Sequence, residues 1–186
     1  PFSWISVPGL QVDAGLRVDA LSGAMILVVT GVGALIHLYS VGYMAGDRGY
    51  GRFFSMLNLF MGFMLLLVSA ADYLLLYVGW EGVGLCSHLL IGFYYERPAA
   101  AAAGMKAFLV NRVGDVFFLL GILLLWTSTG ETAIAAAMGQ APRLASIPVP
   151  VLHCSQATLG ALLLFAGACG KSAQLPLHVW LPDAME

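Results

Sequence analysis

Long apolar runs separated by short polar connections are the dominant pattern of this chain. About five of these runs approach the roughly 20 residues that cross a bilayer as a helix. The fold class predicted is therefore an all-α polytopic membrane protein with about five transmembrane helices. The runs cover residues 20–44, 53–71, 73–95, 105–126 and 157–181.

The first 19 residues follow a different pattern. Apolar and polar residues alternate on either side of Asp13–Gly15, and this predicts a short β-hairpin with a turn that contains glycine. A lone hairpin cannot satisfy its edges in lipid, so residues 1–19 are expected to form an external segment. Residues 20–186 then form the transmembrane domain.

Composition supports a membrane protein, since 60% of the residues are hydrophobic and only 10% are charged. A soluble domain carries about 25% charged residues. The net charge of −2 and the lack of a basic run give no reason to expect a nucleic-acid partner. The three cysteines, Cys86, Cys154 and Cys169, fit neither a disulfide framework nor a metal-ligand spacing. The chain begins at Pro1 without a terminal signal, so we expect a fragment of a longer protein.

The distribution of lysine and arginine predicts the orientation. The connections after the first and third runs lie on the same side and carry more of these residues than the opposite side does. The positive-inside rule places that side in the cytoplasm or its organelle equivalent. The residues on that side are Arg48, Arg52, Arg97 and Lys106, against Arg17 and Arg143 on the other side.

One full charge, Glu81, lies inside the run 73–95. A carboxylate at this depth costs roughly 2.5–3.5 kcal/mol on insertion scales, so such residues are usually paired, protonated or exposed to internal water. Glu81 is either a functional group or half of a structural ion pair. His88, seven residues later, lies on the same helical face. It either extends a polar track or bonds a neighbouring carbonyl.

Three further charges lie in the run 105–126. Arg112 and Asp115 are spaced i, i+3, so they form either a structural pair that neutralises itself or a functional one. Lys106, nearer the helix end, can extend its ammonium to the interface or take part in proton movement.

Lys171 lies near the middle of the last run, and Pro176 follows five residues later. Proline lacks a backbone N–H, so the helix should break between these residues. Broken helices at membrane depth line cavities and often mark transport sites. If Glu81 approaches Lys171, each residue influences how readily the other holds a proton.

Three segments carry a resemblance to a known family. They are GWEGVGLCSHLLIGFYY (79–95), KAFLVNRVGD (106–115) and GKSAQLPLHVWLPDAM (170–185). In this order they resemble the antiporter-like subunit of respiratory complex I, which is subunit L in bacteria and chain 5 in mitochondria. The resemblance extends from about Asp19 to the end of the chain.

The resemblance implies a proton-translocating, non-redox subunit of NADH–quinone oxidoreductase in the cell inner membrane, or the mitochondrial inner membrane in a eukaryote. No cofactor is expected in this chain; NADH, FMN, iron–sulfur clusters and quinone would bind elsewhere in the complex. The implied partners are the other membrane-arm subunits, lipid, protons and internal water. Residues 20–186 would be the first of two inverted repeats.

By motif match, Glu81 and Lys171 are the family's facing glutamate and lysine, and Arg112 and Asp115 are its buried ion pair. His88 stands where the family commonly has tyrosine. Glu81, Lys171, His88 and Lys106 are therefore the candidates for proton translocation.

Other membrane proteins resemble this family in their fold and in having a buried glutamate that faces a lysine. They are the multisubunit cation/proton antiporters, the membrane-bound hydrogenases and the photosynthetic relative of complex I. The forms GWEGVGL and NRVGD favour the respiratory enzyme. A purely structural membrane subunit is an alternative of another class, and it predicts that charge removal at Glu81 and Lys171 leaves turnover intact.

Overall fold

The structure of this chain is a computed structural model that describes residues 2–185 and consists mainly of helices. Four helices have the length and hydropathy of bilayer-spanning helices, and a fifth, α7, is shorter at 16 residues. The predicted all-α membrane fold is therefore confirmed. The five helices are α1 (Ala20–Tyr43), α2 (Tyr50–Ser69), α3 (Tyr73–Ile91), α4 (Pro98–Thr129) and α7 (Gln156–Lys171).

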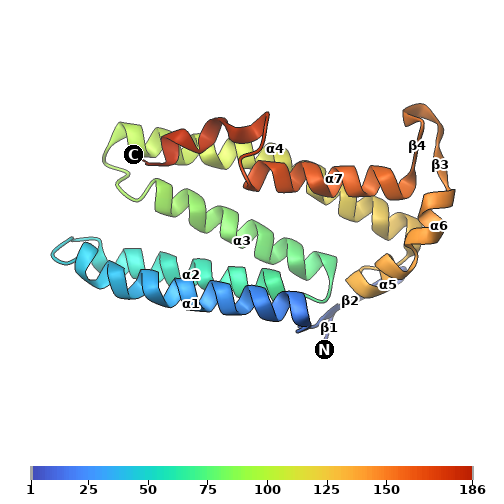
Figure 1. Cartoon of the computed structure of the whole chain (residues 1–186), viewed down its shortest axis with the longest axis horizontal. Coiled ribbons are helices and arrows are strands. Elements are labelled where there is room, and N and C mark those ends of the chain that lie inside the picture. The colour runs from blue at the N-terminus through green and yellow to red at the C-terminus, as the bar shows by residue number, and fades with distance from the viewer. Residues whose placement is uncertain (1, 186) are drawn as a thin grey trace.

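The five helices run along the long axis of the molecule, and each packs against the next in the order α1, α2, α3, α4 and α7 (Figure 1). The α1–α2 and α3–α4 connections lie at one end, together with the C-terminal segment. The α2–α3 turn and the segment between α4 and α7 lie at the other end. This alternation is the one expected of helices that cross a membrane in succession.

Capping side chains fix two of the helix starts. The Asp19 carboxylate accepts a hydrogen bond of 2.9 Å from the backbone N–H of Ser22 at the start of α1, and this bonding lowers the pKa of Asp19. Asp72 accepts one of 2.7 Å from the N–H of Leu74 at the start of α3. Both carboxylates satisfy backbone donors that a helix start leaves free, and both lie at the ends of apolar helices.

The hairpin is present, but its predicted turn is wrong. β1 (Phe2–Val7) and β2 (Leu10–Ala14) pair antiparallel across a turn at Pro8–Gly9, where Gly9 has a φ of +86°. Asp13–Gly15 instead covers the end of β2 and the start of the connection to α1. Proline followed by glycine supplies both the fixed and the left-handed backbone angles that a tight turn uses.

The segment between α4 and α7 closes one end of the bundle. Backbone hydrogen bonds connect the segments that meet at this end. The N–H of Arg17 donates to the Ser69 carbonyl at 2.7 Å, and the N–H of Tyr73 donates to the Thr132 carbonyl at 3.0 Å. The elements of this segment are α5 (Ile134–Gly139), α6 (Ala141–Ser146), β3 (Pro148–Val149), the 3₁₀ turn η1 (Pro150–Leu152) and β4 (Cys154–Ser155).

The last apolar run is interrupted where the sequence predicts it. α7 ends at Lys171, and beyond Ser172 the regular i to i−4 hydrogen bonding stops. Pro176, which has no backbone N–H to donate, lies between α7 and two short 3₁₀ turns. These are η2 (Leu177–Trp180) and η3 (Pro182–Met185).

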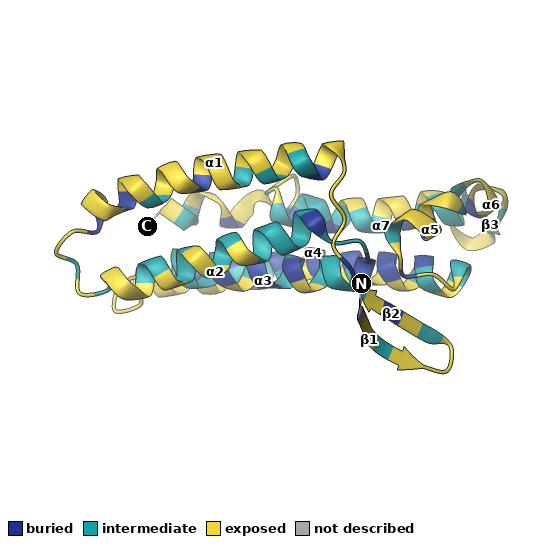
Figure 2. Cartoon of the chain, turned by 90° about the horizontal axis from the view of Figure 1, so that it is seen from below, coloured by how far each residue is buried: buried dark blue, intermediate teal, exposed yellow. Residues whose placement is uncertain are grey.

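Burial is concentrated on α4, whereas α1 is mostly exposed (Figure 2). Large apolar side chains of α1, such as Leu21, Leu27 and Leu38, point outward. A membrane protein presents such a surface to lipid or to neighbouring membrane helices.

α4 and α7 approach closely through glycines. A Cβ added at Gly114 of α4 would lie 3.1 Å from the Cα of Gly170 of α7. Small residues let helices in membranes come together in this way. The contact brings the end of α7, with Lys171, against the middle of α4.

Candidate functional site

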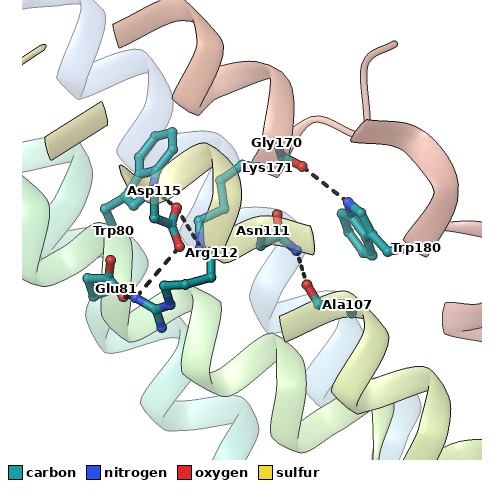
Figure 3. A network of polar contacts seen from close by, with 9 residues as sticks. All are labelled: Trp80, Glu81, Ala107, Asn111, Arg112, Asp115, Gly170, Lys171 and Trp180. Carbon is teal, nitrogen blue, oxygen red and sulfur yellow. Dashed lines mark hydrogen bonds and ion pairs between the residues drawn. The ribbon is translucent and has the colours of Figure 1, made fainter. Parts of the chain in front are cut away.

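Four ionisable side chains from three helices meet inside the helix bundle (Figure 3). α3 contributes Glu81, α4 contributes Arg112 and Asp115, and the last residue of α7 is Lys171. We call these four residues the charged cluster. It contains two groups of each sign, so its formal charge is zero when all four are ionised.

Arg112 and Asp115 connect the charged cluster. Nη1 of Arg112 donates to Oε2 of Glu81 and lies 3.8 Å from Oδ2 of Asp115. The other oxygen of Asp115, Oδ1, lies 3.8 Å from Nζ of Lys171. The Asp115 side chain is only 3% exposed, so this carboxylate depends on the protein for its partners. The contacts form a series from Glu81 through Arg112 and Asp115 to Lys171.

Trp80 holds Asp115 in place. Its indole Nε1 donates a hydrogen bond of 2.6 Å to Oδ1, the oxygen that also faces Lys171. The indole ring stacks on Phe118 with the ring centroids 4.2 Å apart and the planes 7° apart, which fixes its orientation. Nζ of Lys171 lies 5.6 Å from the centroid of the same ring, within the range of a cation–π contact. Trp80 therefore contacts both ends of the Asp115–Lys171 pair.

The ammonium of Lys171 is buried and forms no hydrogen bond with any residue in the range 2–185. Its distance to Asp115 is that of an ion pair and exceeds that of a hydrogen bond. Nζ lies beside Gly84, where an added Cβ would overlap it. A cavity of about 330 Å³, bordered also by Ser87 and Asn111, adjoins Lys171 and is large enough for several water molecules. The ammonium therefore borders this space without a hydrogen-bond acceptor from residues 2–185.

Glu81 and Lys171, which the family resemblance sets opposite one another, form no ion pair with each other. Among the described residues, Glu81 makes its ion pair with Arg112, and Lys171 makes its ion pair with Asp115. The i, i+3 spacing on α4 places one cation and one anion between the two residues. Contacts between Glu81 and Lys171 therefore run through α4, while the Glu81 charge also acts on the ammonium directly through space. The Arg112–Asp115 pair does not act alone either, because each member has a partner on another helix.

His88 and Lys106 lie away from the charged cluster. Nδ1 of His88 is 2.9 Å from the carbonyl of Gly104, and its ring packs against Phe108. Nζ of Lys106 is 2.6 Å from Oδ2 of Asp183, and both of these side chains are nearly half exposed. Of the alternatives for His88, the structure shows the hydrogen bond to a carbonyl.

Two of these side chains, Trp80 and Asp183, were not predicted from the sequence. An indole N–H within an apolar run needs an acceptor, which is a signal that points to Trp80. Asp183 could have been found as a carboxylate at the same end of the bundle as Lys106. Within residues 2–185, no group of three or more histidine, cysteine or acidic residues is placed to hold a metal ion.

Family models match most of the chain. Residues 70–186 match a model described as NADH:quinone oxidoreductase/Mrp antiporter, TM. Residues 4–54 match one described as NADH-Ubiquinone oxidoreductase (complex I), chain 5 N-terminus. The charged cluster lies wholly within the first match.

Individual relatives agree with these models. NADH-quinone oxidoreductase subunit L of Mycobacterium tuberculosis is 52% identical to this chain over 187 residues. The subunit L of Neisseria meningitidis is 46% identical over 190 residues. Both matches cover 100% of this chain. This chain spans 28% of the length of either relative. A solved structure of the Mrp complex from Dietzia sp. DQ12-45-1b matches with a TM-score of 0.86 and 31% identity, over 98% of this chain and 19% of the matched chain. The chain therefore belongs to the NADH:quinone oxidoreductase/Mrp antiporter transmembrane family.

Proposed function

We propose that this chain is part of a proton-translocating subunit L of NADH–quinone oxidoreductase in an inner membrane. The observation that carries the proposal is the charged cluster, in which ionisable groups from three apolar helices are linked in series. Charges within membrane helices are costly and usually mark ion or proton pathways. The identity of 52% to a subunit L supports the choice of enzyme.

In the proposed mechanism, Arg112 divides its positive charge between two carboxylates. When Arg112 moves from Glu81 towards Asp115, it replaces Lys171 as the counter-charge of Asp115. The Lys171 ammonium, no longer stabilised, gives one proton to water in the adjoining cavity and becomes a neutral amine. When Arg112 returns to Glu81, Asp115 again favours the ammonium, and the amine takes up one proton.

The magnitude of this coupling is sufficient for a switch. Two unit charges about 4 Å apart interact by about 4 kcal/mol at an effective dielectric constant of about 20. Such a change corresponds to roughly a thousandfold change in the ratio of ammonium to amine. Lys171 and Asp115 are 3.8 Å apart with side chains 18% and 3% exposed, so solvent screens their interaction only partly.

We place the redox chemistry in other subunits of the complex. NADH, FMN, iron–sulfur clusters and quinone bind there, and quinone reduction drives the charged cluster through the neighbouring membrane-arm subunits. This chain supplies the site at which the proton is held and released.

The test uses Glu81→Gln and Lys171→Ala in the full-length subunit within the assembled complex. Glutamine keeps the shape of the side chain, so we expect assembly to persist while proton flux in reconstituted vesicles and coupled quinone reduction both fall. The double variant should be no worse than the more damaging single change, since the residues act as one unit. Glu131→Gln, at an exposed carboxylate outside the charged cluster, is the matched control and should leave flux unchanged. Full pumping by both assembled single variants would show that the charged cluster is structural.

A second candidate is a subunit of a multisubunit cation/proton antiporter. The match to the Mrp complex, with a TM-score of 0.86, favours it. The two functions differ in what drives the proton. Proton flux driven by a sodium gradient without NADH oxidation would support the antiporter, whereas flux that requires NADH and quinone would support the respiratory enzyme.

A further inference from the structure

A pocket of about 450 Å³ lies at the end of the bundle where the α1–α2 and α3–α4 connections meet. Three arginines line it: Arg48 and Arg52 from the first of these regions and Arg97 from the second. We call it the arginine pocket. It shares no lining residue with the charged cluster, so a ligand bound there would serve a role separate from the proposed function and independent of it.

The arginine pocket has cationic groups without counter-charges. None of its three guanidinium groups forms an ion pair with a carboxylate of residues 2–185. Two carboxylates also line the pocket, and one of them, Asp47, already accepts hydrogen bonds from the Gly49 N–H at 2.6 Å and the Tyr94 hydroxyl at 3.1 Å. Three cations thus share the pocket with two carboxylates, a formal charge of +1, and both oxygens of Asp47 are engaged by neutral donors. This imbalance favours binding of an anion.

Aromatic rings hold two of the guanidinium groups in place. The guanidinium of Arg52 lies 4.6 Å from the ring centroid of Phe93 and 4.9 Å from that of Tyr95, and it donates a hydrogen bond of 2.9 Å to the Phe93 carbonyl. The guanidinium of Arg97 lies 4.9 Å from the ring centroid of Tyr94. A guanidinium ordered before binding loses less entropy on contact with an anion, and its planar fork matches the oxygens of a phosphate.

We propose that the arginine pocket binds the phosphate group of an anionic phospholipid. The pocket lies at the ends of helices that are long and apolar enough to cross a bilayer. The lysine and arginine distribution predicts that this end is cytoplasmic, and basic pockets between membrane helices on that side bind such headgroups. The last two turns of α1 lead to the pocket and expose Tyr39 and Tyr43, aromatic residues of the kind found at membrane interfaces. The exposed apolar side of α1, including Leu38, offers a surface for the acyl chains.

The experiment measures phosphatidylglycerol bound to the purified, delipidated full-length subunit by native mass spectrometry. The variants are Arg48→Gln, Arg52→Gln and Arg97→Gln, and each should weaken binding about fivefold, the effect of about one basic residue near a membrane surface. Phosphatidylcholine, which has no net charge, should bind equally to all the variants. Arg143→Gln is the matched control: it removes an exposed guanidinium at the opposite end of the bundle and should leave phosphatidylglycerol binding unchanged.

Arg48 makes the test independent of folding. Arg52 and Arg97 contact aromatic rings of the α3–α4 connection, so their variants can also disturb the connection, whereas Arg48 is exposed and forms no side-chain hydrogen bond or ion pair with residues 2–185. Unchanged phosphatidylglycerol binding in Arg48→Gln would overturn the proposal. A second probe, inorganic phosphate, distinguishes the source of the phosphate group. Displacement of phosphatidylglycerol by inorganic phosphate at equal concentration would show a site for the free anion and overturn the lipid assignment.

Discussion

Replacing Arg112 by alanine should damage assembly as well as activity. The substitution removes one of two cations and leaves the charged cluster with a net charge of −1. Asp115 would keep its hydrogen bond of 2.6 Å from Trp80 and its ion pair of 3.8 Å with Lys171. Glu81 would lose the only ion pair that it forms within residues 2–185.

The expected cost follows from burial. Breaking a buried ion pair by removing one partner typically costs about 3–5 kcal/mol. Arg112 is 39% exposed and Glu81 is 24% exposed, so solvent screens part of the loss. We therefore expect a destabilisation of about 3 kcal/mol, the lower end of the range. Such a loss is a large fraction of the stability of an ordinary domain, about 5–15 kcal/mol.

Two measurements test this expectation. The yield of assembled complex on native gels reports assembly, and thermal unfolding of the full-length subunit in detergent reports stability. Arg143→Ala removes an exposed guanidinium that donates to Gln140 and forms no ion pair within residues 2–185, and it serves as the control. Arg112→Ala combined with Glu81→Gln restores a neutral charged cluster, so the double variant should recover most of the stability without recovering proton flux. An Arg112→Ala subunit that assembles and melts like the unmodified protein would refute the reasoning.

The same geometry supports three more predictions. Trp80→Phe keeps an aromatic ring but removes the indole N–H, so thermal unfolding should show a loss of about 1–3 kcal/mol from the lost hydrogen bond to the Asp115 carboxylate. An unchanged melting temperature would contradict this. Gly84→Ala places a Cβ against the flexible end of the Lys171 side chain, so proton flux should fall while assembly persists. Gly62→Ala, where an added Cβ meets only open space, is the control and should change neither flux nor assembly. In otherwise cysteine-free protein, Gly51→Cys and Gly139→Cys should be labelled from opposite faces of the membrane; labelling of both from one face would refute the topology.

Much of the fold could be predicted from the sequence because a helix needs about 20 apolar residues to cross a bilayer. Apolar runs located α1 to α4 within a few residues, apart from the early start of α4 at Pro98. That difference arises from the alanine-rich stretch before residue 105, which has high helix propensity and continues the helix beyond its apolar part. The break before Pro176 could also be predicted, since the missing N–H is a property of one residue.

The partners within the charged cluster could not be predicted in the same way. Sequence spacing shows which residues share a helix face, but it does not show which helix that face meets. The sequence alone therefore allows Glu81 to approach a cation on α4 or on α7. The structure resolves this through packing, because the close approach of α4 to α7 at Gly114 and Gly170 brings Asp115 between Arg112 and Lys171.

The residues of the charged cluster differ in where they lie along their helices. Arg112 and Asp115 lie within 32 continuous helical residues, so their backbone is held on both sides. Lys171 is the last residue of α7 and is followed by a segment without regular hydrogen bonding, so its backbone can adjust at low cost. The carbonyls at the end of α7 favour the ammonium by about 0.3–1 kcal/mol. A charge at about 4 Å contributes about 4 kcal/mol at an effective dielectric constant of about 20. The arrangement of Arg112 and Asp115, rather than the helix end, therefore decides whether Lys171 holds its proton, and the helix break allows that residue to respond.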